Sequence, residues 1–100
     1  MPYAEVLQSG HKYTSESIRK PPDVADCVAV RLKSQREWQL SRRPLGERGS
    51  IELVVGSGDG KVVGIAHVHP SPYGSRIESW ITHRAVLTRD IWQQEFFGSC

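Results

Sequence analysis

Residues 50–68 constrain the fold most, because they read as two buried strands joined by a tight turn. Ser50 to Val55 is rich in β-branched and aliphatic side chains, and Lys61 to Val68 returns with the same character. Gly56-Ser57-Gly58-Asp59-Gly60 lies between them and supplies the residue types of a hairpin turn. We therefore expect an antiparallel hairpin at the centre of the chain.

The length and composition fit one small soluble domain. The chain has 100 residues, of which 38% are hydrophobic and 24% charged, so a single compact core is expected. No apolar run approaches the roughly 20 residues that cross a bilayer. The first ten residues lack the basic start and apolar core of a secretory signal. We expect a cytoplasmic protein with no membrane partner.

Two helices are predicted at the ends of the chain. Residues 3–10 place Tyr3, Val6 and Leu7 on one side and end at a glycine. Thr88 is expected to cap a final helix that Gly98 ends. The inner face of this helix is expected to hold four apolar residues, which are Ile91, Trp92, Phe96 and Phe97.

Residues 26–41 give conflicting signals. Val24, Val28 and Leu32 have helical spacing, whereas Val28, Val30 and Leu32 alternate as in a strand. The β-branched content and the later Trp38-Gln39-Leu40 favour a hairpin around residues 33–36. Pro21-Pro22 is expected to stop the preceding segment.

The two cysteines are expected to be reduced. Cys27 and Cys100 have no disulfide framework around them, and the last residue is expected to fray. The sequence contains no C-x-x-C pair, so a thiolate zinc site is not expected.

Basic residues are concentrated in the N-terminal half. Nine of the 13 lysines and arginines lie in residues 11–48, together with five acids. This bias fits either a surface that faces phosphates or a solvated face that keeps the protein soluble. The candidate nucleic-acid residues are Lys12, Tyr13, Arg19, Lys20, Arg42, Arg43 and Arg48, in which the tyrosine would stack on an unpaired base.

Two segments resemble ASCH domains, which are small β-barrels of the PUA-like superfamily associated with RNA. Residues 3–22 resemble the family's opening helix, its G-x-K segment and the basic and proline positions that follow. Residues 48–98 are similar to its middle hairpin and its final helix. The resemblance implies an α+β fold: a mostly antiparallel, PUA-like (ASCH-type) barrel with flanking short helices and a cleft for one nucleotide.

The chain also departs from the family pattern. Glu16 and Arg19 come later than the family's acid and arginine, and residues 23–47 form an unmatched insertion. Related barrels add a closing strand after the last helix, whereas this chain stops at Cys100. An open barrel edge would favour pairing with a protein partner.

Some members of the family are amidohydrolases that remove the acetyl group from N4-acetylcytidine. Their lysine and a hydroxyl residue three positions later correspond to Lys12 and Ser15, with Glu52 or Glu78 as the carboxylate. A lysine that loses its proton in a dry pocket can activate a hydroxyl nucleophile. Serine stands here in place of the family's threonine.

His67-Val68-His69-Pro70 is similar to the zinc ligands of JAMM-type metalloproteases. On a strand both imidazole rings would face one side. The downstream aspartate ligand is missing, because Ser79 leads to Thr82. We therefore expect no metal and no cofactor.

The sequence predicts a small module that binds RNA, another single-stranded nucleic acid or a nucleotide without catalysis. A metal-independent amidohydrolase is the first alternative. A protein-binding inhibitor or adaptor is the second, with Trp80 as an anchor if it is exposed and as a core residue if it is not.

Overall fold

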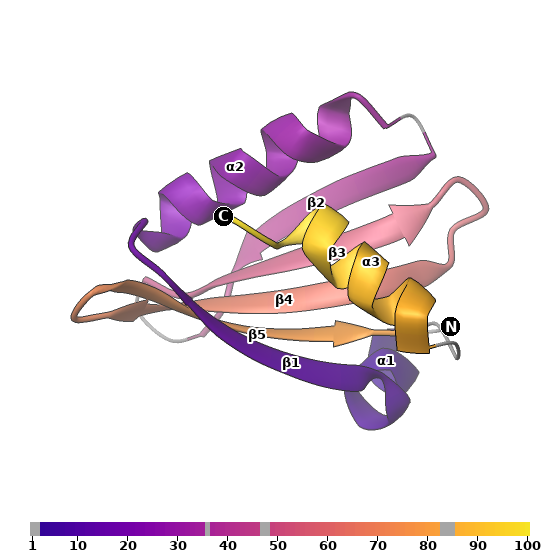
Figure 1. The fold of residues 1–100 in the computed structure, drawn as a ribbon, viewed down its shortest axis with the longest axis horizontal. Helices are drawn as coiled ribbons and strands as arrows, with labels where there is room; N and C mark the ends of the chain where they lie inside the picture. The colour runs from indigo at the N-terminus through magenta and orange to yellow at the C-terminus, as the bar shows by residue number, and fades with distance from the viewer. Residues whose placement is uncertain (1–2, 36, 47–48, 83–85) are drawn as a thin grey trace.

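The computed structural model describes residues 3–35, 37–46, 49–82 and 86–100 and has an α+β fold (Figure 1). Three helices accompany one five-stranded antiparallel sheet, whose strand order is β1-β5-β4-β3-β2. In chain order the elements are α1 (Tyr3–Ser9), β1 (His11–Ser17), α2 (Pro21–Lys33), β2 (Trp38–Pro44), β3 (Ile51–Ser57), β4 (Val62–Ser71), β5 (Gly74–Ile81) and α3 (Val86–Phe96).

The sheet is open, so the expected barrel is wrong. Strands β1 and β2 form the two edges, and each pairs with one neighbour among the described strands. Closing a barrel would require these two edges to pair. Instead α2 connects them and passes over one face of the sheet (Figure 1). An open edge strand can pair with another protein. The protein partner expected from the sequence stays a prediction.

The central hairpin and its turn are confirmed. Strand β3 pairs with β4 from Ile51↔Val68 to Gly56↔Val62. Gly60 adopts a positive φ of 86° in the turn, which glycine does at low cost. Strand β4 continues through Pro70 to Ser71, beyond the expected end at Val68.

Residues 21–33 form a helix, and the expected hairpin near residues 33–36 is wrong. The two prolines occupy the first turn of α2. Backbone N–H groups in a first turn have no acceptor within the helix, so proline breaks no hydrogen bond there. Val24, Val28 and Leu32 form its buried face, so the helical spacing was the informative pattern. Arg36 lies outside the described residues.

The main core lies between the sheet and the two helices α2 and α3. Its buried members come from both helices and from β3, β4 and β5, including Val28, Leu53, Val68, Ile81 and Phe96. Trp92 packs against Trp38 with ring centroids 5.3 Å apart.

Helix α3 differs from its prediction in two details. Because it begins at Val86, Thr88 lies inside the helix and does not cap it. Ile91 is 48% exposed, so it does not share the inner face with Phe96 and Phe97, which are buried. The N–H of Gly98 donates to the carbonyl of Gln94, which ends the helix as expected.

A disulfide joins Cys27 to Cys100, so the expectation of two reduced thiols is wrong. The Cα atoms are 5.7 Å apart, and the bond links α2 to the C-terminal residue. Figure 1 shows the C-terminus beside α2. Cys100 is only 6% exposed and is not frayed. The sequence separation of 73 residues concealed this contact, which only the packing of the C-terminal segment on α2 creates.

Within the described part of the chain, no helix is long and apolar enough to cross a membrane.

Candidate functional site

The sheet face opposite the main core carries a row of charged side chains, here called the polar face. Arg43, Glu52, His67 and Glu78 are consecutive cross-strand neighbours on β2, β3, β4 and β5. Since side chains alternate along a strand, all four project to the same side. Helix α1 contacts β4 and β5 on this side, where Val6 and Ile65 are buried outside the main core cluster.

Glu52 is the centre of the first half of the polar face. Its carboxylate is fully buried and accepts hydrogen bonds from Arg43 Nε at 2.6 Å and from the Tyr3 hydroxyl. His67 Nε2 lies 2.9 Å from its second oxygen. Burial alone would raise the pKa of Glu52, but these hydrogen bonds and the charge of Arg43 lower it below its usual value. A buried anion is thus satisfied on three sides.

Glu78 is the centre of the second half. Lys12 Nζ lies 2.8 Å from one carboxylate oxygen, and Arg76 and His69 Nε2 each lie 3.4 Å from the other. The hydrogen bond from Lys12 lowers the pKa of Glu78, and the nearby positive charges add to this effect. His69 Nδ1 in turn lies 2.9 Å from Ser50 Oγ. Serine, histidine and glutamate therefore follow one another in a contact chain.

Trp80 lies between the two halves of the polar face. It is half-buried there rather than part of the main core. Its ring centroid is 5.0 Å from that of His67, and Lys12 Nζ lies 5.6 Å from the Trp80 centroid. These contacts with Trp80 help to position the side chains of Lys12 and His67.

The polar face opens into a pocket of about 480 Å³ at the β4–β5 turn, here called the Ser50 pocket. Its lining residues are Glu16, Ser50, His69, Pro70, Ser71, Pro72, Tyr73 and Arg76. A second hollow of about 440 Å³, here called the Ile18 groove, lies on the other side of the same turn. Its lining includes Ile18, Lys20, Pro21, Pro22, Gly49 and Gly74, and it shares Tyr73 with the Ser50 pocket.

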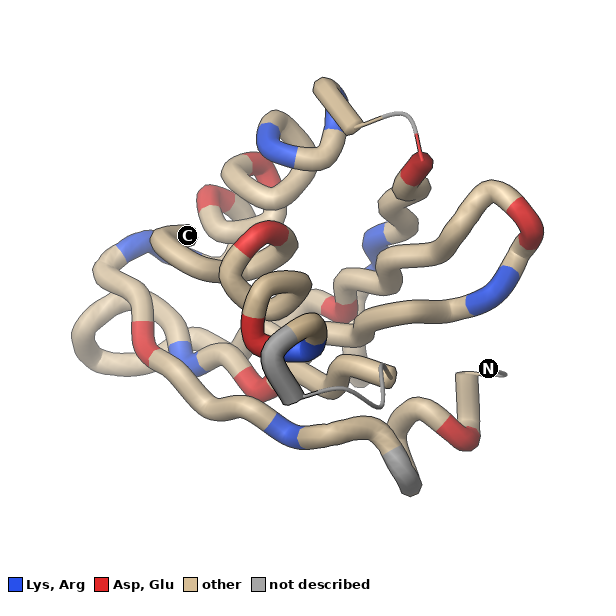
Figure 2. The backbone as a smooth tube through the Cα atoms, turned by 45° about the vertical axis from the view of Figure 1, so that its right-hand side comes forward, with Lys and Arg blue, Asp and Glu red and all other residues tan. Residues whose placement is uncertain are grey.

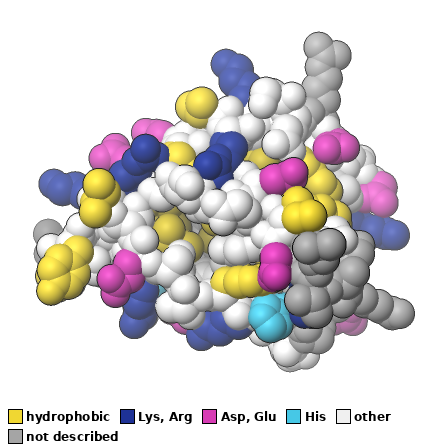
Figure 3. All heavy atoms as spheres, in the orientation of Figure 1, with side chains coloured by type: hydrophobic (Ala, Val, Ile, Leu, Met, Phe, Trp, Pro, Cys, Tyr) yellow, Lys and Arg dark blue, Asp and Glu magenta, His cyan; other side chains and the backbone are white. Residues whose placement is uncertain are grey.

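Exposed apolar side chains gather at this end of the molecule. Ile18 is 90% exposed and Tyr73 is 76% exposed. Hydrophobic side chains stand out at the left of Figure 3, the end at which Figure 1 shows the β4–β5 turn. An exposed aromatic ring between two hollows is a feature of binding sites rather than of a stable core.

The residues predicted to bind nucleic acid are not brought together on one surface. Lys12 and Arg43 lie on the polar face, whereas Tyr13 lies on the opposite face and donates to Asp90 at 2.6 Å. Arg42 bridges to Asp26 of α2 at 2.8 Å. Basic and acidic residues alternate along the backbone in Figure 2 rather than forming a continuous stripe.

Two of the predicted basic residues do lie near the Tyr73 end. Arg19 and Lys20 form the link between β1 and α2, and Lys20 lines the Ile18 groove. Arg48, the last of the set, lies outside the described residues. Arg76 belongs to the same end but was missed, because its position beside His69 depends on the β4–β5 pairing.

The predicted pair of Lys12 and Ser15 does not meet. They are three positions apart on one strand, so their side chains project to opposite faces of the sheet. Lys12 lies opposite Trp80 and binds Glu78, as one version of the hydrolase hypothesis required, but Ser15 lies opposite Ile77. Ser50 is instead the serine that lies close to Glu78 through His69. One sequence feature could have identified Ser50. It lies two residues before Glu52, and this spacing places both side chains on one face of a strand.

His67 and His69 project to the same face, as predicted, with ring centroids 6.3 Å apart. Each ring lies beside a carboxylate, and no group of three metal-binding side chains occurs among residues 3–35, 37–46, 49–82 and 86–100. We expect purified protein to contain less than one tenth of a zinc per chain by mass spectrometry of the metals, because a protein site normally supplies about three ligands. One zinc per chain that His67→Ala removes would contradict this prediction.

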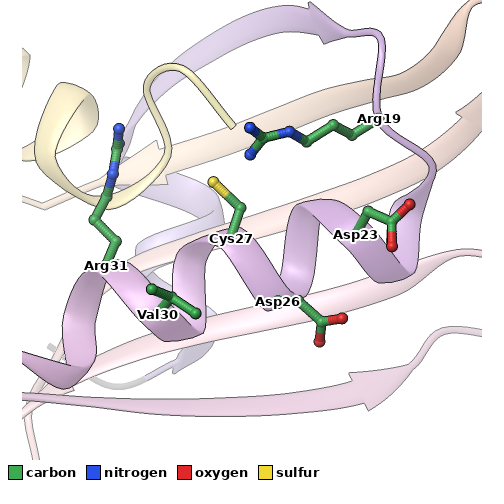
Figure 4. A pocket seen from close by; sticks show the side chains of 6 residues that line it. All are labelled: Arg19, Asp23, Asp26, Cys27, Val30 and Arg31. Carbon is green, nitrogen blue, oxygen red and sulfur yellow. The ribbon is translucent and has the colours of Figure 1, made fainter.

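Another pocket, of about 640 Å³, lies beside α2 and the disulfide (Figure 4). Arg19 and Arg31 reach over the helix near Cys27, while Asp26 points away from them (Figure 4). The Arg31 guanidinium is held by the carbonyl of Gln94 at 2.8 Å, and Asp26 is held by Arg42. These charged groups serve packing between elements, so the Ser50 pocket is the better candidate site.

Comparison with known proteins adds no relative. No family model matches the sequence, and no curated protein or solved structure is significantly similar to the chain.

Proposed function

We propose that the chain is a small domain that binds single-stranded RNA or a nucleotide at its Tyr73 end. The observation that carries the proposal is the position of Tyr73, an exposed ring between two hollows that each contain a basic residue. Arg76 lines the Ser50 pocket and Lys20 lines the Ile18 groove. An unpaired base would stack on the ring while the two cations contact the phosphates on either side.

The dimensions and chemistry of the Ser50 pocket fit one nucleotide. Its volume of about 480 Å³ falls in the range of small-ligand pockets. Arg76 offers donors to a phosphate, and prolines provide apolar walls. Glu16 also lines the pocket and would repel an anion, so we expect modest affinity.

The two hollows are held in a fixed relation to each other. Ser75 Oγ, next to the β4–β5 turn, donates to the carbonyl of Arg19 at 2.6 Å. Gly74 has a φ of 142°, and a Cβ there would lie 2.4 Å from the carbonyl oxygen of Ser17. Only glycine permits this close approach of the turn to the β1–α2 link. A site formed in advance loses less entropy when a ligand binds.

Tyr73→Ala is expected to weaken binding of a hexanucleotide RNA roughly 5- to 160-fold, since stacking of a base on an aromatic ring contributes about 1–3 kcal/mol. Fluorescence anisotropy at 50 mM salt measures the change. Tyr73→Phe should retain most of the affinity, because it keeps the ring. The affinity should also fall with salt, by a slope of about −0.7 for each phosphate contacted.

Arg76→Ala and Lys61→Ala form a matched pair for the charge contribution. Lys61 lies on the β3–β4 turn, remote from the Tyr73 end, and is exposed. Arg76→Ala should weaken binding and reduce the salt slope, while Lys61→Ala should do neither. Equal losses in the two variants, or no binding at 50 mM salt, would reject the proposed site.

A further inference from the structure

The Ser50 pocket contains a serine, a histidine and a carboxylate in sequence. Ser50 Oγ lies 2.9 Å from His69 Nδ1, and His69 Nε2 lies 3.4 Å from Glu78 Oε1. The three side chains come from the residue before β3, from β4 and from β5. This is the order of nucleophile, base and orienting group that activates a serine hydroxyl.

We propose that Ser50, His69 and Glu78 form a hydrolytic site that cleaves esters of small carboxylic acids. Ser50 is the nucleophile, His69 is the general base, and Glu78 is a positioning residue that orients the imidazole. The inference goes beyond ligand binding, and it does not require the ligand to be RNA.

The sheet register explains why the three groups meet. Ile51 pairs with Val68, so Ser50, the residue before β3, lies next to His69 of β4, with its Oγ 2.9 Å from His69 Nδ1. His67 pairs with Glu78, and Arg76 pairs with His69, which places Glu78 diagonally across from the His69 ring. Regular strands hold two of the three groups, so their spacing does not depend on a loop.

The surroundings suit each role. The Ser50 residue is 3% exposed but lines the pocket, so a substrate that enters the pocket reaches it in a mostly dry environment. Lys12 and Arg76 lower the pKa of Glu78, which keeps the carboxylate ionised near neutral pH. An ionised Glu78 faces the N–H of His69 Nε2 as an acceptor, which leaves Nδ1 as the acceptor for the serine hydroxyl. The separation of 3.4 Å between Glu78 and His69 is loose, as such pairs often are before a substrate binds.

The reaction needs only water as a co-reactant. Ser50 Oγ bonds to the ester carbonyl carbon while its proton passes to His69 Nδ1, and the imidazolium then protonates the departing alkoxide as the carbon–oxygen bond breaks. Water next attacks the acyl-serine, gives a proton to His69, and releases the carboxylic acid as Ser50 regains its proton. Arg76 lines the same pocket and supplies a positive charge for the oxyanion.

A fluorophosphonate probe tests the nucleophile directly, because the serine oxygen displaces fluoride from phosphorus. We expect one adduct per chain, mapped to Ser50 by peptide mass spectrometry. Ser15→Ala is the matched control, since it removes an exposed serine on the other face of β1. Ser15→Ala should label like the wild type, and Ser50→Ala should not label.

Hydrolysis of a small acetate ester tests the positioning role. Glu78→Gln should lower kcat roughly 10-fold or more and leave KM nearly unchanged, because the carboxylate acts through His69 rather than on the substrate. Thermal unfolding of each variant separates this effect from loss of the fold. A higher KM with an unchanged kcat would contradict the assigned role of Glu78.

The failure of this proposal is distinguishable from failure of the proposed binding function. RNA anisotropy on Ser50→Ala should be near normal, because Ser50 contributes no charge and no ring. If Ser50→Ala does not fold, the adduct map of the wild-type protein decides the question. A probe that labels no serine, or a serine other than Ser50, would overturn the hydrolytic site.

Discussion

Replacing both cysteines by serine is expected to lower the free energy of unfolding by about 4 kcal/mol. The disulfide closes a loop of 73 residues and so restricts the unfolded chain strongly. It also holds the C-terminal residue against α2, where the Ser17 hydroxyl donates to the carbonyl of Cys100. Urea unfolding of oxidised wild type and of Cys27→Ser/Cys100→Ser measures the difference.

A reducing agent provides the control for the disulfide prediction. Reduced wild type should unfold at nearly the same urea concentration as the double variant, and the variant itself should not respond to reduction. If oxidised and reduced wild type unfolded alike, the bond would contribute nothing in solution. The prediction would then be wrong, and the packing of Phe96 and Phe97 would account for the position of the C-terminal segment.

Glu52→Gln is expected to reduce the free energy of unfolding by about 2–3 kcal/mol at neutral pH. The carboxylate is fully buried and binds Tyr3, Arg43 and His67, and hydrogen bonds to a charged group contribute about 1.5–3 kcal/mol. We expect less than the sum over the three hydrogen bonds, because Arg43 is 63% exposed and can return to water. Glu37→Gln is the matched control, since Glu37 is exposed.

The effect of Glu52→Gln should also depend on pH. The folded-state pKa of Glu52 lies below its ordinary value of 4.5, so the ionised form favours the folded state. Its contribution is fully present above the unfolded pKa and disappears as the pH falls through the folded pKa. The difference in stability between wild type and Glu52→Gln should therefore shrink below about pH 4.5. A difference that stays constant down to pH 2 would show that Glu52 acts by shape and not by charge.

The parts of the fold that the sequence predicted are those with local signals. The hairpin of β3 and β4 has two β-branched runs and a glycine-rich turn, and both α1 and α3 end near a glycine. Residues 21–33 were misread, because β-branched valines weigh against a helix until their burial is known. The packing of Val24, Val28 and Leu32 against the sheet decided between the two patterns.

The features that the sequence did not predict depend on long-range contacts. The open sheet follows from the pairing of β1 with β5, and the disulfide follows from the docking of the last residues on α2. At the candidate site, Lys12 and Glu78 were both identified, yet Ser50 was not, because its partner His69 lies across a strand pair. Among the described basic residues, strand alternation places Arg42 and Arg43 on opposite faces of the sheet, and Arg42 pairs with Asp26 of α2.

The two faces of the central strands should tolerate substitutions in opposite ways. Along β4, Val68 is packed in the core and should accept only apolar side chains of similar volume, whereas His67 and His69 lie beside carboxylates. Positions on the polar face should instead accept changes that preserve charge or a hydrogen-bond donor, whatever the side-chain volume. In a complete mutational scan, successive residues of one strand would thus alternate between a size requirement and a charge requirement, with a period of about two residues.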